Sequence, residues 1–216
     1  MNKANFPVPV FGIRRHRMGT DGKGVTTLVA FMHCPLRCKY CLNNQCHGSI
    51  YQEDDGTLRK DIRMLTPGKL YDIVRKDDLY FQTTGGGICF GGGEPALRAD
   101  FICEFAKLCG KQWKITIETS LTAPPGHLSK LASVADKWFV DVKDMNPDIY
   151  KRYTGSVSQI RENLMLLKEK VPVDKITVKV PHIPDFNSNE DVKASIRELN
   201  RMGFKDIREF QYINYK

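Results

Sequence analysis

Residues 25–31, VTTLVAF, and residues 33–41, HCPLRCKYC, decide the fold of this 216-residue chain. The first stretch is apolar and β-branched, which predicts a buried strand. The second places Cys34, Cys38 and Cys41 in one short loop directly after that strand. Parallel α/β folds build their sites where strands end, so we expect these thiols at a functional edge of a sheet.

The same order of strand and helix continues along the chain. Thr66 and Pro67 are typical of a helix start, as an N-cap and a first helical residue. The other expected elements follow from hydrophobic patterns of similar kind. The predicted strands are residues 25–31, 87–90, 115–117, 137–140, 175–180 and 207–212, and the predicted helices are 66–76, 98–108, 126–134, 158–170 and 188–202.

Six strands that alternate with helical regions predict a parallel sheet with right-handed crossovers. A closed barrel of eight such units takes about 250 residues. The chain therefore suits an incomplete (β/α)6 TIM-like barrel with parallel strands, or an open doubly wound sheet.

Composition and length indicate one folded domain over residues 1–216. The chain is 41% hydrophobic and 27% charged, which is typical of a globular protein. Residues 1–24 are expected to form a basic lead-in, 25–212 the β/α core, and 43–65 a polar excursion. No apolar run approaches the roughly 20 residues that cross a bilayer, and no signal peptide is evident at the N-terminus. We expect a cytoplasmic protein with no membrane partner.

The charge excess lies close to the cysteine loop. The chain has a formal charge of +8, and residues 1–50 hold seven Lys and Arg against one Asp. Such an excess suits an acidic partner protein or, less well, nucleic acid, for which no aromatic-interleaved basic motif is present.

The clustered cysteines favour a metal centre. Seven cysteines cannot all pair, and Cys46, Cys89, Cys103 and Cys109 show no zinc-ribbon or ferredoxin-like spacing. A structural zinc site needs four closed ligands, and Cys46 is the nearest candidate for a fourth. Three thiolates from one loop would instead hold three irons of a 4Fe-4S cluster and leave the fourth iron without a protein ligand. We predict a single cluster of that kind.

The pattern Cys-x3-Cys-x2-Cys, with Tyr40 just before Cys41, resembles the hallmark of radical S-adenosylmethionine enzymes. The resemblance implies that S-adenosylmethionine binds the open iron of a cluster held by Cys34, Cys38 and Cys41, with Tyr40 and Leu42 beside the cofactor. It further implies that reductive cleavage of the cofactor gives a 5′-deoxyadenosyl radical, which abstracts a hydrogen atom.

Two further motifs resemble cofactor-binding segments of that family. Residues 91–95, GGGEP, resemble its Gly-Gly-Glu-Pro motif, which implies that Gly92, Gly93 and Glu94 bind the methionine ammonium, Glu94 through its carboxylate and backbone carbonyl. Residues 141–143, DVK, resemble an Asp-x-Lys motif. Asp141, Val142 and Lys143 would then contact the ribose and the methionine carboxylate, although a surface ion pair is the simpler alternative.

Three more side chains are weaker candidates for cofactor contacts. Glu118 and Ser120 follow the predicted strand 115–117 and resemble a ribose or ammonium contact, although Thr119-Ser120-Leu121 replaces the usual Thr-Asn-Gly. His182 follows the fifth strand in a Pro-rich turn that resembles an adenine-flanking segment. A structural, hydrogen-bonded histidine is the alternative there.

The order of these motifs resembles glycyl-radical enzyme activating enzymes, the group of pyruvate formate-lyase activating enzyme. Residues 19–25, GTDGKGV, resemble that group's Asp-Gly-Pro-Gly segment, with Lys23 in place of Pro. The resemblance implies a large glycyl-radical enzyme as protein substrate and an acidic electron donor, such as a flavodoxin or ferredoxin. Leu42 stands where a His often follows the third Cys, and Gly91 replaces a frequent Ser.

Two alternatives from other classes remain open. The first is a radical enzyme acting on a peptide or on a small molecule, as 7-carboxy-7-deazaguanine synthase does. The second, more distant one is a non-enzymatic module that binds nucleic acid through its basic lead-in.

Overall fold

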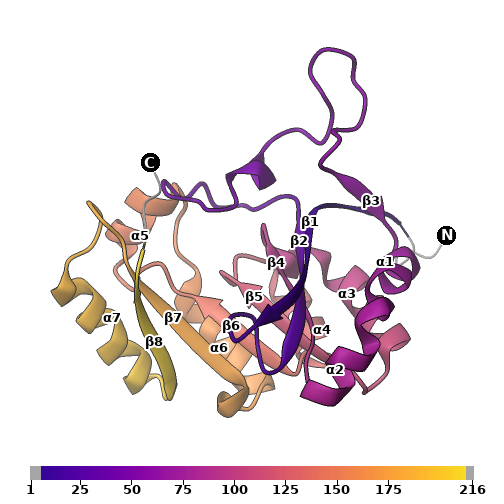
Figure 1. The fold of residues 1–216 in the computed structure, drawn as a ribbon. Helices are drawn as coiled ribbons and strands as arrows, with labels where there is room; N and C mark the ends of the chain where they lie inside the picture. The colour runs from indigo at the N-terminus through magenta and orange to yellow at the C-terminus, as the bar shows by residue number, and fades with distance from the viewer. Residues whose placement is uncertain (1–5, 213–216) are drawn as a thin grey trace.

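A single curved sheet of eight strands forms the centre of the molecule (Figure 1). The structure is a computed structural model that describes residues 6–212. The strand order is β3-β1-β2-β4-β5-β6-β7-β8. The strands are β1 (Val8–Met18), β2 (Val25–Phe31), β3 (Arg63–Leu65), β4 (Gly87–Gly92), β5 (Lys114–Thr119), β6 (Lys137–Asp141), β7 (Ile176–His182) and β8 (Asp206–Gln211).

All six predicted strands are present, as β2, β4, β5, β6, β7 and β8, and each is parallel to its neighbour in this set. Within the described residues β8 pairs only with β7, so the sheet curves without closing. The incomplete barrel with parallel strands is confirmed.

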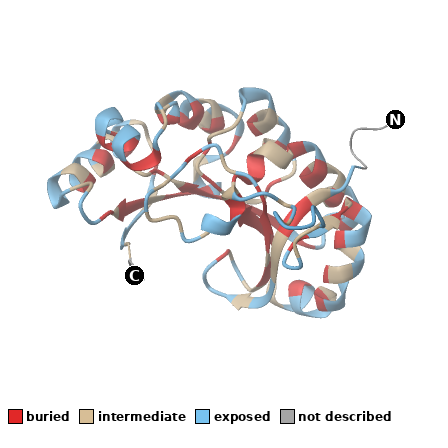
Figure 2. Cartoon of the chain, turned by 90° about the horizontal axis from the view of Figure 1, so that it is seen from above, coloured by how far each residue is buried: buried red, intermediate tan, exposed pale blue. Residues whose placement is uncertain are grey.

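Helices cover the outer face of the sheet (Figure 2). They are α1 (Pro67–Val74), α2 (Asp78–Thr84), α3 (Ala99–Cys109), α4 (Pro125–Ala132), α5 (Pro147–Thr154), α6 (Ile160–Lys170) and α7 (Asn189–Arg201). The hydrophobic core lies between sheet and helices, where the Phe31 and Phe90 rings stack with centroids 5.5 Å apart. The inner face of the sheet is left free to line a cavity.

The five predicted helices are found as α1, α3, α4, α6 and α7, and their caps explain where they begin. The Thr66 hydroxyl accepts a hydrogen bond from the Lys69 amide at the start of α1. Ser188 and Asp191 form a capping box at the start of α7. The sequence did not predict α2 and α5, which have only seven and eight residues.

The basic lead-in of residues 1–24, for which the sequence predicted no strand, contains one in its described part. β1 is an 11-residue strand that pairs antiparallel with β2 and, through its first three residues, with β3. Its charged half is compatible with a sheet because two acids pair with it, Asp77 from a distant position and Asp21 from just after the strand. The Arg15 Nε atom donates to the Asp77 carboxylate at 2.8 Å, and Asp77 has no exposed surface.

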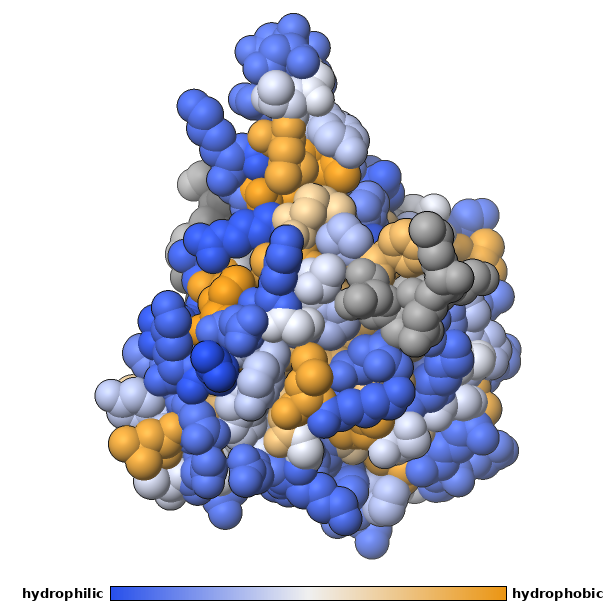
Figure 3. Space-filling view, turned by 90° about the vertical axis from the view of Figure 1, so that its right-hand side faces the viewer, coloured by the Kyte–Doolittle hydropathy of each residue, from blue (hydrophilic) through white to orange (hydrophobic). Residues whose placement is uncertain are grey.

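The polar excursion of residues 43–65 leaves the sheet and returns to it at β3. It contains a short 3-10 helix, η2 (Asn44–His47), and a small hairpin closed by a bridge between Tyr51 and Leu58. The hairpin projects above the sheet in Figure 1, and its tip is hydrophilic in Figure 3.

None of the described helices combines the length and apolar character that a bilayer span requires.

Candidate functional site

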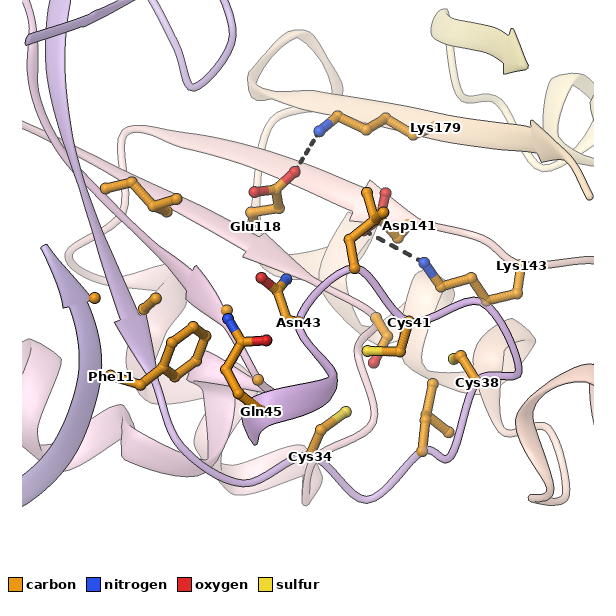
Figure 4. A pocket seen from close by; sticks show the side chains of 18 of the residues that line it. Phe11, Cys34, Cys38, Cys41, Asn43, Gln45, Glu118, Asp141, Lys143 and Lys179 are labelled. Atoms are coloured by element: carbon orange, nitrogen blue, oxygen red, sulfur yellow. Dashed lines mark hydrogen bonds and ion pairs between the residues drawn. The ribbon is translucent and has the colours of Figure 1, made fainter. Parts of the chain in front are cut away.

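A cavity of about 1010 Å³ opens at the carboxyl ends of the parallel strands. The cysteine loop (residues 33–41), the ends of β4, β5 and β6, and parts of β1, β7 and β8 surround it (Figure 4). The sequence placed its candidate site at this edge, and most of the candidate residues do line this one space.

The three thiols of the cysteine loop form one wall of the cavity. Cys34, Cys38 and Cys41 all line it. The loop is held against the end of β4, where the Gly93 amide donates to the Phe31 carbonyl and the Glu94 amide donates to the His33 carbonyl, both at 2.9 Å. These contacts bring the cysteine loop and the glycine turn together.

Glycine is required at this turn because the backbones approach too closely for a side chain. A Cβ on Gly93 would lie 2.3 Å from the His33 carbonyl oxygen. A Cβ on Gly92 would lie 2.7 Å from that of Ala30, and the Gly92 φ of +88° also favours glycine. Both glycines line the cavity, so their backbone is open to a ligand.

The three thiols differ in their ease of ionisation. Burial raises the pKa of Cys34 to about 12 and also raises the pKa of Cys38. The neighbouring Cys46 side chain instead lowers the pKa of Cys41. Metal binding deprotonates a coordinating thiol outright, so these two half-buried thiols would ionise on binding a metal centre.

The donor set fits an iron–sulfur cluster. Thiolate sulfur is the ligand that such clusters take, and three thiols border one open space here. Cys46 is buried next to Cys41 and does not line the cavity. The loop therefore offers three sulfur ligands toward the cavity, which would leave one iron of a cubane free for another ligand.

The Glu94 carboxylate is buried and already fully hydrogen-bonded. It accepts from the Ala96 amide at 3.0 Å, from the Thr119 hydroxyl at 2.5 Å, and from the Ser120 amide and hydroxyl at 2.9 and 2.7 Å. Four donors match the capacity of a carboxylate. Glu94 thus joins the glycine turn to the end of β5. Its backbone carbonyl accepts from the Leu97 amide at 3.2 Å and has one further lone pair, and Glu94 is not among the residues that line the cavity.

Ion pairs form the opposite wall of the cavity. Lys143 Nζ lies 3.5 Å from the Asp141 carboxylate, and Lys179 Nζ lies 2.5 Å from that of Glu118, as the dashed lines in Figure 4 show. Burial opposes the charge on Lys143, but Asp141 and Cys38 nevertheless raise its pKa. Burial raises the pKa of Glu118, with Asp141 adding to the effect and Lys179 opposing it. Asp141 and Lys143 thus form an ion pair, as the alternative of a surface ion pair expected, but the pair lies inside the cavity.

The other predicted residues divide into two groups. Leu42 and Ser120 line the cavity. Tyr40, Val142 and His182 are outside its lining: the Tyr40 hydroxyl donates to Asp185 at 2.8 Å, and Val142 is fully buried. His182 Nε2 lies 2.6 Å from the carboxylate of Glu209, a residue at the cavity. Cofactor contacts by these three residues, as by those that line the cavity, stay predictions.

Several lining residues were not found from the sequence. Lys179 could have been recognised, because it is the register partner of Asp141 and side chains of paired residues share a face. Many of the others lie on β1 and in or just after β8, and those on β1 were missed because no strand was expected there. The missed lining residues include Phe11, Arg14, Arg17, Arg208 and Tyr212.

The fold and site together define an open α/β barrel that presents a three-thiol loop and a glycine turn at the carboxyl edge of its sheet. Residues 28–199 match the family described as the Radical SAM superfamily, which spans most of the chain. The protein belongs to the radical SAM superfamily.

Activating enzymes are among its similar relatives. Pyruvate formate-lyase 2-activating enzyme of Escherichia coli is 27% identical over 233 residues, which cover 95% of this chain and 77% of the relative. Pyruvate formate-lyase-activating enzyme of Clostridium pasteurianum is 28% identical over 193 residues, covering 89% of this chain and 75% of the relative.

Solved structures of low identity share the fold. QueE from Escherichia coli superposes with a TM-score of 0.51 at 13% identity, over 95% of each chain. Methylornithine synthase (PylB) gives a TM-score of 0.61 at 14% identity, over 87% of this chain and 53% of that one. These likenesses support the partial barrel and carry no information on substrate.

Proposed function

We propose that this protein is an activating enzyme that generates a glycyl radical in a partner protein. The observation that carries the proposal is the cavity itself, where three thiols, the glycine turn and the Asp141–Lys143 pair surround one space. A 4Fe-4S cluster bound by Cys34, Cys38 and Cys41 would supply the electron that cleaves S-adenosylmethionine.

The residues of the chain have distinct tasks in this proposal. The Gly92–Gly93 backbone and the Glu94 carbonyl would bind the methionine ammonium. Lys143 would bind its carboxylate, since a buried ammonium group that stays charged suits an anion. Asp141, held in place by Lys143, would bind the ribose hydroxyls.

The open side of the barrel supports a protein substrate. β1 and β8 both border the cavity, and no strand of the described residues joins them. A loop that carries the target glycine could enter there and bring its α-carbon to the cofactor. The relatives named above are themselves activating enzymes, which supports the same assignment.

The proposal is tested by reconstituting the protein anaerobically with iron and sulfide. With dithionite, S-adenosylmethionine and a glycyl-radical enzyme encoded beside it, we expect an organic radical signal with an α-hydrogen doublet in the partner. The signal should be absent when the target glycine is changed to Ala. Sustained formation of 5′-deoxyadenosine with a small molecule or short peptide as substrate, and no radical in any large partner, would contradict the proposal.

A further inference from the structure

The fold divides the basic residues of the first fifty positions into separate groups. Arg15 pairs with the buried Asp77, and Arg17 pairs with the buried Asp21. Arg14 lines the cavity. Two of the basic residues near the cysteines are thus paired within the fold. Among the described ones, exposed Lys23 lies in the turn after β1, and Arg37 and Lys39 lie in the cysteine loop itself.

Two basic residues of the cysteine loop point away from the cavity. Leu36 and Cys38 line the cavity, whereas Arg37 and Lys39, which alternate with them, are exposed and do not line it. The loop thus has an inner side of thiols and an outer side of positive charge.

Helix α5 adds two more positive charges beside this outer side. The Arg37 amide donates to the Thr154 carbonyl at 2.8 Å, and the Lys39 amide donates to the Tyr153 carbonyl at 3.1 Å, so the loop is fastened to the end of α5. Exposed Lys151 and Arg152 lie in the last turn of that helix. We call Arg37, Lys39, Lys151 and Arg152 the loop–α5 face.

The positive charge of the loop–α5 face is not neutralised by the fold. Among the described residues, none of its four side chains has an ion-pair partner, and Arg152 donates only to the Phe186 carbonyl. The nearby acids accept hydrogen bonds from other groups: Asp185 accepts from Tyr40, and Asp191 belongs to the capping box of α7. The hydrogen bonds from Ser188 lower the pKa of Asp191, and the Arg152 charge adds to this effect but forms no ion pair with it. Asp148 lies one helical turn before Lys151 and Arg152 on α5, and among the described residues it forms an ion pair with neither.

We propose that the loop–α5 face is the docking site of an acidic protein that donates one electron to the cluster. This inference rests on the proposed function, because it requires a cluster at the three thiols. A donor on this face would lie across the loop backbone from Cys38 and would leave the cavity free for cofactor and substrate. The donor loses one electron and the cluster gains it, with no bond made or broken.

Charge complementarity is the physical reason for this choice of partner. A cluster of unpaired cations speeds association with an acidic partner by about 10- to 1000-fold at low ionic strength. The exposed tip of the excursion carries Glu53, Asp54 and Asp55. These acids would repel the same donor and so favour its approach from the α5 side.

The test compares two charge-reversal variants of equal charge change. Lys39→Glu/Lys151→Glu alters the loop–α5 face, whereas Lys170→Glu/Lys205→Glu alters exposed lysines at the amino edge of the sheet, at the end of α6 and the start of β8. A reduced flavodoxin of net negative charge is the probe. Its binding is measured by fluorescence titration, and cluster reduction by stopped-flow absorbance, at 50 and 300 mM salt.

We expect the first variant to bind flavodoxin at least about tenfold more weakly at low salt, and the control variant to match the wild type. Dithionite-driven cleavage of S-adenosylmethionine should be the same in all three proteins, which separates this inference from the proposed function. Equal flavodoxin binding by both variants, or binding that does not depend on salt, would overturn the inference. Tighter binding of a DNA duplex than of flavodoxin to the same face would also overturn it.

Discussion

The two walls of the cavity are built in different ways. The thiol wall, made of Cys34, Cys38, Cys41 and the Gly92–Gly93 turn, comes from two short segments that are hydrogen-bonded to each other. The ion-pair wall joins Glu118 on β5 to Lys179 on β7, which are 61 residues apart in the sequence. The three thiols of the first wall are encoded locally, within one short loop, although the glycine turn joins them only when β2 and β4 pair. The second wall exists only once strands distant in the sequence have assembled.

This difference separates two kinds of function within one cavity. The thiol wall supplies ligands, and a ligand is either present or absent. The ion-pair wall supplies orientation and charge, and its contribution is graded because each pair is partly screened by water. Changes on the two walls should therefore differ in size and in what they alter.

The largest effect is expected on the thiol wall. Cys38→Ala should abolish both the cluster absorbance and the formation of 5′-deoxyadenosine, because two thiols cannot hold the three irons. The unfolding free energy should change by less than about 1 kcal/mol, since the residue lies in a partly exposed loop. Cys103→Ala on α3, outside the cavity, is the matched control and should keep both signals. Retained 5′-deoxyadenosine in the Cys38 variant would refute the cluster assignment.

The same contrast explains what the sequence could predict. The six parallel strands and the cysteine loop follow from local hydrophobic runs and from residue spacing, and all were found where expected. β1 was missed because its half that contains Arg15 and Arg17 is polar. Asp77, which lies 62 residues from Arg15 and is brought beside it by the fold, makes that half compatible with a sheet, and Asp21 pairs with Arg17 from just after β1. The long-range Arg15–Asp77 pair leaves no local pattern.

Glu94 shows how a motif can suggest the right residue and leave its contacts unknown. The sequence indicated a carboxylate facing the cofactor. In the structure four donors from the protein surround that carboxylate, two of them from Ser120. Nothing in the residues 91–95 could reveal those partners, because Thr119 and Ser120 reach Glu94 only when β4 and β5 pair.

The second largest effect is expected on the ion-pair wall. Lys143→Met should weaken S-adenosylmethionine binding by about 10- to 100-fold, the cost of one charge-assisted hydrogen bond to its carboxylate. Iron content should stay at about four per chain, because the thiol wall is untouched. Equilibrium binding of labelled cofactor measures the first quantity and iron analysis the second. Lys170→Met is the control. If Lys143→Met instead lost iron and kept its affinity for the cofactor, the ion-pair wall would hold the cluster and not the cofactor, contrary to the proposal.

Glu94 links the two walls, and its removal should change the free energy of unfolding more than the affinity for the cofactor. Glu94→Ala leaves the donors of Ala96, Thr119 and Ser120 without their acceptor, which costs about 1–3 kcal/mol of unfolding free energy. The cluster should remain, and cofactor binding should weaken only as far as the turn loosens. Urea unfolding and cofactor titration measure the two effects. Glu94→Gln keeps one carbonyl acceptor, so its unfolding free energy should lie between those of Glu94→Ala and the wild type. Unchanged stability of Glu94→Ala would show that the four hydrogen bonds contribute nothing net.

The smallest effect concerns the pH dependence of the ion-pair wall. Burial raises the pKa of Glu118 above its ordinary value of about 4.3. Between that value and the raised one, the folded protein binds more protons at this site than the unfolded chain does, so its contribution to stability declines as pH rises. Glu118→Gln removes this titration, and wild type should therefore lose stability relative to the variant as pH increases from 4, by on the order of 1 kcal/mol or less. Urea unfolding at a series of pH values measures the difference. A gap between the two proteins that stays constant with pH, or one that moves in favour of wild type, would mean that Lys179 outweighs burial and keeps Glu118 charged at no cost.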